Sequence, residues 1–167
     1  LMTFIWLVGV GMIFSLISQA GFFAYLTIHR FGLGIFKGLW NAVQLVLIGF
    51  VLFDVVYVRY SAFGEAGGLM PYMVDAFVIL AVALAVAYMK AKQTNPQTFV
   101  PALFFMTVVT VVEWVPVLIQ NDKSWLYFML VPLLVCNAYQ LLSLHKINAK
   151  SKIELEDKKI KAKVREA

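Results

Sequence analysis

The sequence is short of charge, cysteine and histidine. Of its 167 residues, 14% are charged and 62% are hydrophobic, whereas a soluble domain is about 25% charged and about 45–50% apolar. This composition excludes an ordinary soluble domain and indicates a membrane protein. The single cysteine, Cys136, lies inside an apolar run, which excludes an internal disulfide and a metal cluster held by several thiolates.

Motifs that carry catalysis are also absent from the sequence. The two histidines, His29 and His145, do not form an HExxH metal motif, and there is no GxSxG nucleophile motif and no GxxxxGK[ST] phosphate loop. The segment "FGLGIF" contains G-x-G but lacks the third glycine and the preceding strand of a nucleotide-binding fingerprint. We therefore expect a protein that is not an enzyme and that uses no cofactor and no metal.

Long apolar runs make up most of the sequence. Five of them are close to the length that crosses a bilayer, and they cover residues 1–28, 39–58, 71–89, 99–119 and 125–144. Because the runs are continuous and lack the alternation of barrel strands, they predict helices. The sequence therefore predicts an all-α transmembrane helix bundle over residues 1–144, followed by a basic tail of mixed charge over residues 145–167.

The basic residues predict how the bundle is oriented. Eight of the fourteen Lys and Arg follow Leu144, so the net charge of +5 describes a tail and not a surface that binds nucleic acid. If the tail is cytoplasmic, the loops 29–38 and 90–98 lie on the same side, with twelve basic residues inside and only Arg59 and Lys123 outside. We expect a multi-pass protein of the cell membrane with a cytoplasmic C-terminus. Leu1 then lies outside, so we expect a sixth, upstream span in the intact protein.

Three acidic residues lie inside the predicted spans, namely Asp54, Asp75 and Glu113. A carboxylate in hydrocarbon costs several kcal/mol, so such groups face the bundle interior or a wet cavity. Their spacing from the span ends places them in one layer near the outer side. Three interpretations stay open: ion pairing with Arg59 or Lys123, a polar pocket for a ligand or partner, and ion transport. Other polar side chains in the spans predict hydrogen bonds between helices, and they are Ser15, Ser18, Gln19, Asn41, Gln44, Asn137 and Gln140.

The first connection carries an unusual alternation of glycine and large apolar residues, "FGLGIFKGLW". His29 and Arg30 predict the point at which the first helix leaves the membrane. Trp40, like Trp114, is expected to lie at the membrane interface. We interpret the connection either as an apolar segment along the inner interface or as a contact surface for a partner, with Arg30, Gly32, Gly34 and Trp40 as the candidate contact residues.

The tail is expected to continue the fifth helix into the cytoplasm. Glu154 and Lys158, like Asp157 and Lys161, stand four residues apart in the order that favours a helix. Ile153, Ile160 and Val164 fall on one stripe, which leaves two roles open, a lipid-facing helix or docking to a partner. The sequence also leaves a homo-oligomer open.

The segment from Gly21 to Tyr60, "GFFAYLTIHRFGLGIFKGLWNAVQLVLIGFVLFDVVYVRY", resembles the KinB-signalling-pathway activation protein family of spore-forming Gram-positive bacteria. The resemblance extends through the short loops and the charged tail. It implies a small polytopic protein that helps a membrane sensor histidine kinase feed phosphate into the sporulation relay, and it carries over no functional residues.

Two functions from different classes follow. The first is a regulator that binds the membrane domain of the kinase through helix–helix contacts in the bilayer and biases the kinase toward its active state, without catalysis. The alternative is a small transporter or ligand-binding membrane protein that uses the acidic layer.

Overall fold

A computed structural model describes residues 2–64, 68–120 and 122–166. Side chains are described for these residues except Pro71, Gln120, Lys123, His145, Asn148, Lys152 and residues 156–166. Every regular element in the described residues is helical, which confirms the all-α prediction. In chain order these are α1 (Met2–Phe36), the short 3₁₀ turn η1 (Lys37–Leu39), α2 (Trp40–Phe63), α3 (Met70–Gln93), the 3₁₀ turn η2 (Pro96–Thr98), α4 (Phe99–Phe104), the π-helical turn η3 (Phe105–Val109), α5 (Thr110–Gln120) and α6 (Lys123–Glu166).

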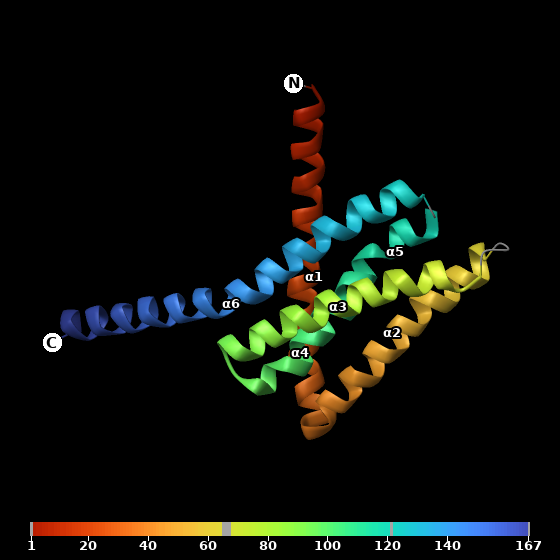
Figure 1. The fold of residues 1–167 in the computed structure, drawn as a ribbon. Helices are drawn as coiled ribbons and strands as arrows, with labels where there is room; N and C mark the ends of the chain where they lie inside the picture. The colour runs from red at the N-terminus through yellow and green to blue at the C-terminus, as the bar shows by residue number, and fades with distance from the viewer. Residues whose placement is uncertain (1, 65–67, 121, 167) are drawn as a thin grey trace.

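Four helical segments in the described chain are long and apolar enough to cross a membrane: Met2–Phe63, Tyr72–Gln93, Pro96–Ile119 and Ser124–Leu155. The first has 62 residues, or about 93 Å at 1.5 Å per residue, roughly three times the thickness of a hydrocarbon core. It contains both α1 and α2, which Figure 1 shows as two rods that diverge from their junction. The count of five spans stays a prediction.

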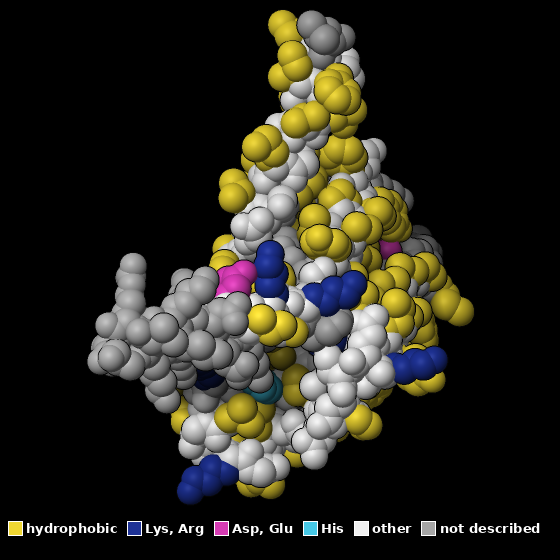
Figure 2. Space-filling view, turned by 90° about the vertical axis from the view of Figure 1, so that its left-hand side faces the viewer, with side chains coloured by type: hydrophobic (Ala, Val, Ile, Leu, Met, Phe, Trp, Pro, Cys, Tyr) yellow, Lys and Arg dark blue, Asp and Glu magenta, His cyan; other side chains and the backbone are white. Residues whose placement is uncertain are grey.

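The connections lie at two opposite ends of the bundle. Figure 1 shows the α1–α2 and α3–α4 junctions at the lower end, and the α2–α3 and α5–α6 connections at the upper right. Each of the central rods therefore runs from one end of the bundle to the other. Figure 2 shows apolar side chains along the projecting arm at the top and Lys and Arg side chains on the lower half of that face.

Both loops expected at the lower end are shorter than predicted. The sequence predicted a loop over residues 29–38, but α1 continues to Phe36 and the chain reverses within η1, where Lys37 adopts a left-handed backbone with φ 47°. Gly32 and Gly34 did not end the helix, because in an apolar environment the helix itself satisfies the backbone hydrogen bonds. Likewise α3 extends to Gln93, so Lys90 is part of the helix and not of a loop.

A rod formed by α4, η3 and α5 lies at the centre of the bundle and contacts α1, α2, α3 and α6. Its π-helical turn carries fully buried side chains at Phe105, Met106 and Thr107. The sequence analysis did not predict this turn. A π-turn inserts one extra residue into a helix and changes the direction of the side chains beyond it. The turn η3 therefore sets which neighbouring helices the side chains of Thr110 and Glu113 face.

The last helix continues through the tail as predicted, while the cytoplasmic location of the tail stays a prediction. α6 runs unbroken over 44 residues from Lys123 to Glu166, and its C-terminal part projects from the bundle (Figure 1). Ile153 is exposed. The side chains of Lys158, Asp157, Lys161, Ile160 and Val164 lie outside the described set, so the ion pairs and the apolar stripe stay predictions.

Candidate functional sites in the helix bundle

An ion pair connects α2 and α3. Arg59 Nη1 donates to Asp75 Oδ2, and both side chains are buried. Tyr127 on α6 donates its hydroxyl to the other Asp75 oxygen at 3.1 Å. The Arg59 guanidinium lies over the rings of Tyr72 and Trp114, at 5.1 and 6.0 Å from their centres. The Asp75 carboxylate is therefore bonded at both oxygens, and its site joins three helices.

The sequence offered Arg59 as an ion-pair partner for the acidic layer, and Asp54 stands five residues earlier on the same helix. Five residues turn an α-helix by about 500°, so the two side chains leave α2 about 140° apart. A partner on a neighbouring helix is easier to reach, and the structure pairs Arg59 with Asp75. The ion-pairing interpretation is thus confirmed for Asp75. The other suggested cation, Lys123, has a side chain outside the described set.

A second polar site connects α1, α5 and α6. Ser18 Oγ donates to Asn137 Oδ1, and Gln140 Nε2 donates to Ser18 Oγ at 2.9 Å. Asn137 Nδ2 in turn donates to Thr110 Oγ1 and to Glu113 Oε2, both at 2.9 Å. Ser18, Thr110 and Asn137 are fully buried. The prediction that Ser18, Asn137 and Gln140 join helices by hydrogen bonds is confirmed, and Thr110 and Glu113 belong to the same network.

Gly21 makes room for the Glu113 carboxylate. A Cβ placed on Gly21 would overlap Glu113 Oε1 and would lie 2.8 Å from its Cδ and 3.0 Å from Val109 Cγ1. Within the described residues, Glu113 Oε1 is buried without a hydrogen-bond partner. Nothing in the sequence places Gly21 against Glu113, which lies 92 residues further along the chain.

A third site lies at the α1–α2 junction. Trp40 is 4% exposed and donates Nε1–H to His29 Nδ1 at 3.0 Å. Gly32 is buried directly beneath the Trp40 ring. Trp114 is fully buried and donates to the carbonyl of Leu126 at 2.9 Å. Both indole rings therefore pack inside the bundle, and their position at the membrane interface stays a prediction.

The four candidate contact residues of this junction therefore differ in accessibility. Arg30 and Gly34 are exposed, whereas Gly32 and Trp40 are packed against each other inside the bundle. The two buried residues shape the turn and do not offer a surface. That the junction contacts a partner stays a prediction.

Lys90 forms a further contact that the sequence did not indicate. Its Nζ donates to the carbonyl of Leu141 at 2.7 Å, and its side chain is buried. The bond fastens the end of α3 to α6. The lysine had been assigned to a loop, since its position at the end of an apolar run is typical of a basic residue that leaves the membrane.

The predicted acidic layer is divided among three surroundings. Asp75 is bonded to Arg59 and Tyr127, and Glu113 is bonded to Asn137. Asp54 lines a groove between α2 and α5. In the described part of the chain, no group of three or more His, Cys, Asp or Glu residues is arranged to hold a metal ion.

Comparison with known proteins places this bundle in a family. A sequence model described as "KinB-signalling pathway activation in sporulation" matches residues 1–147. The chain belongs to the KinB-signalling-pathway activation family. It is 52% identical over 148 residues to the KinB-signaling pathway activation protein of Bacillus subtilis (strain 168), an alignment that covers 87% of this chain and 75% of that protein. No solved structure matches the chain.

The family match spans all three polar sites. It ends at residue 147, so it includes the ion pair, the Glu113 network and the α1–α2 junction, while the remainder of α6 lies beyond it. The resemblance inferred from Gly21 to Tyr60 is thereby confirmed. In this chain the buried and half-buried charged and amide side chains at these sites bond to other helices, among them Arg59, Asp75, Lys90, Glu113, Asn137 and Gln140.

Proposed function

We propose that this protein activates the KinB sporulation signalling pathway from within the cell membrane, by binding the membrane domain of the sensor histidine kinase. The observation that carries this proposal is the family match over residues 1–147, together with the 52% identity to a protein named for that activity. In this proposal the chain crosses the membrane five times, has a cytoplasmic C-terminus and performs no catalysis itself.

Helix–helix contact is the mechanism that the exposed surfaces support. Within the bundle, the buried polar side chains of α1, α5 and α6 are bonded to one another, while large apolar side chains face outward along α1, α2 and α5, among them Phe23, Phe31, Val58 and Val112. Such surfaces are compatible with lipid and with the membrane helices of a partner. A protein that binds the active conformation of a kinase better than the inactive one shifts the kinase toward activity and needs no active site.

Reconstitution tests this proposal directly. The kinase is incorporated into proteoliposomes with and without the full protein, and its autophosphorylation and the recovery of the complex on an affinity tag are measured. We expect co-purification and a higher rate of phosphorylation only when both proteins are present. Neither co-purification nor a change in rate would reject direct activation of the kinase.

The orientation requires its own measurement. With Cys136 replaced by serine, single cysteines introduced at exposed positions near the two ends of the bundle, Gly34 and Ser61, are labelled in intact cells with a membrane-impermeant maleimide. We expect labelling at Ser61→Cys and protection at Gly34→Cys, as the distribution of basic residues predicts. The reverse pattern would invert the orientation.

One observation favours the alternative of a ligand-binding or transport protein, namely the groove that contains Asp54. A flux of cations across proteoliposomes that depends on Asp54, measured without any kinase, would support transport. Kinase activation without flux would support the regulatory function.

A further inference from the structure

We propose that the groove between α2 and α5 receives a transmembrane helix of the kinase, and that a basic side chain on this helix pairs with Asp54. The inference rests on the proposed function and names the surface through which the two proteins would meet.

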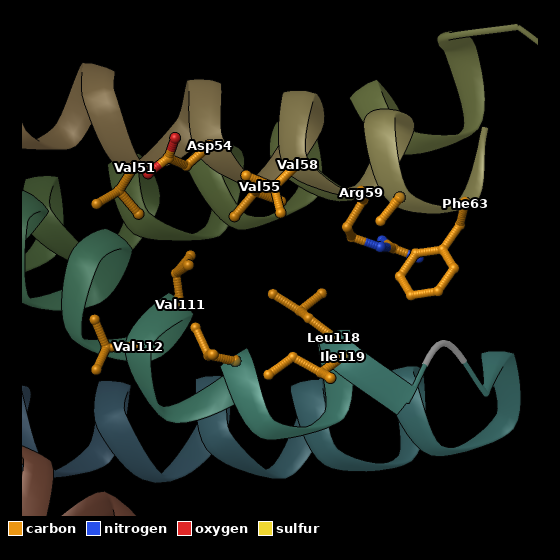
Figure 3. Close-up of a pocket in the computed structure, with 12 residues that line it drawn as sticks. Val51, Asp54, Val55, Val58, Arg59, Phe63, Val111, Val112, Leu118 and Ile119 are labelled. Atoms are coloured by element: carbon orange, nitrogen blue, oxygen red, sulfur yellow. The ribbon is translucent and has the colours of Figure 1, made fainter.

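The groove has the dimensions and the lining of a contact site inside a membrane. Its volume is about 370 Å³, and apolar side chains from Val51, Val55 and Val58 on α2 face others from Val111 and Leu118 on α5. Figure 3 shows these two rows of side chains on opposite sides of an open space. A row of side chains from an incoming helix packs into such a space as a ridge packs into a groove.

Two polar side chains interrupt this apolar lining, Asp54 and Arg59. In Figure 3, Asp54 lies toward one end of the groove, and Arg59 and Phe63 lie toward the other. Arg59 is buried and directs its guanidinium to Asp75. Asp54 is half-buried, and no hydrogen bond or ion pair reaches its carboxylate from the side chains that the structure describes.

The position of Asp54 along α2 makes this charge costly. Asp54 lies within the apolar run over residues 39–58, four residues or about 6 Å inside the end of that run. A short carboxylate side chain reaches less far toward an interface than the long stems of lysine and arginine. Ionisable groups at membrane depth are expensive and are found paired with an opposite charge or facing a wet cavity.

The lining of the groove is more complementary to a helix with a basic residue than to a phospholipid or to a second copy of this chain. A phospholipid brings a negatively charged phosphate that Asp54 repels, and its acyl chains offer no hydrogen-bond donor. In a second copy of this chain, Arg59 and Lys90, the basic residues next to the spans of α2 and α3, are already bonded to Asp75 and to the carbonyl of Leu141. An arginine or lysine on a partner helix supplies both the charge and the apolar neighbours.

Site-specific photo-crosslinking with the full protein and the kinase in membranes tests the position of the contact. The crosslinking amino acid replaces Val112, which lines the groove and is 60% exposed, or Val46, which lies on α2 outside the groove and is 71% exposed. We expect at least tenfold more crosslinked kinase from Val112 than from Val46. Equal yields, or a crosslink from Val112 only to lipid or to a second copy of this chain, would overturn the proposal.

The charge is tested separately. Asp54→Asn keeps the shape of the side chain and removes its charge, and we expect it to lower the kinase recovered by co-purification at least tenfold while the amount of protein in the membrane stays unchanged. Asp54→Glu is expected to restore recovery. Asp54→Lys is expected to bind when one intramembrane Arg or Lys of the kinase is replaced by Asp, each such residue being tested in turn.

These outcomes distinguish a failure of the groove proposal from a failure of the proposed function. Recovery of the kinase by Asp54→Asn at the wild-type level would reject the groove and leave the proposed function standing. If the unmodified protein neither recovers nor activates the kinase, the proposed function fails, and the groove fails with it. Asp75→Asn is the matched control, because it removes a bonded carboxylate and is expected to lower the amount of folded protein instead.

Discussion

Gly32 and Gly34 stand two residues apart in α1, and the structure predicts opposite results when each is replaced by alanine. A Cβ at Gly32 would overlap the Trp40 ring, at the edge formed by Cδ2, Cε2 and Cζ2. A Cβ at Gly34 would meet nothing within 4 Å. The ring cannot yield by rotating a flexible end, because it is buried and bonded to His29.

The cost of Gly32→Ala follows from these contacts. Forcing a methyl group into a packed site costs about 1–3 kcal/mol, and displacement of the ring from His29 removes a hydrogen bond of about 1 kcal/mol. We therefore expect a loss of about 2–4 kcal/mol in the free energy of unfolding. For Gly34→Ala we expect no loss and a gain of up to about 1 kcal/mol, since alanine has the higher helix propensity.

Thermal unfolding of the purified variants in detergent measures the change in stability caused by Gly32→Ala and by Gly34→Ala. A chain of this size shifts its Tm by about 2–4 °C per kcal/mol, so Gly32→Ala is expected to lower Tm by about 4–20 °C relative to Gly34→Ala. The double variant Gly32→Ala/Trp40→Phe provides the internal check, because phenylalanine lacks the indole edge that meets the new methyl group. It should be about as stable as Trp40→Phe alone, with a coupling energy above about 1 kcal/mol.

The reasoning would be refuted if Gly32→Ala and Gly34→Ala unfolded within about 0.5 kcal/mol of each other. An additive double variant would show that Gly32 and Trp40 do not touch. Either result would also remove the physical explanation for Gly32.

Two further predictions concern the other polar sites. Gly21→Ala is expected to displace the Glu113 carboxylate from Asn137 and to lower the free energy of unfolding by about 2 kcal/mol. Gly11→Ala, with nothing within 4 Å of its Cβ, should cause no loss and a gain of up to about 1 kcal/mol in the same assay, as at Gly34. Asp75→Asn breaks a buried ion pair and should cost about 3 kcal/mol, measured as a lower Tm and less protein in the membrane. A Gly21→Ala variant as stable as Gly11→Ala, or an Asp75→Asn variant with wild-type Tm, would contradict these assignments.

The sequence determined the class of fold because that class depends on local properties. Apolar runs of about 20 residues with little charge can satisfy their backbone in lipid only as helices, and this logic predicted helices over 71–89, 99–119 and 125–144, where the structure has α3, the α4–η3–α5 rod and part of α6. The unbroken extension of α6 followed from the spacing of charges. The family resemblance, too, was present in the residues from Gly21 to Tyr60, and it was confirmed.

Only the tertiary structure decided which polar groups meet. Helical periodicity gives the direction of a side chain relative to its own helix, but not the rotation of one helix against another. Asp75 and Arg59 are 16 residues apart, and Ser18 and Asn137 are 119 apart, so their pairing depends on packing between helices. The π-turn before Thr110 rotates α5 by an amount that no pattern in the sequence predicted. For the same reason, the sequence predicted that Gly32 lies in a loop, whereas in the structure it belongs to α1 and packs against Trp40.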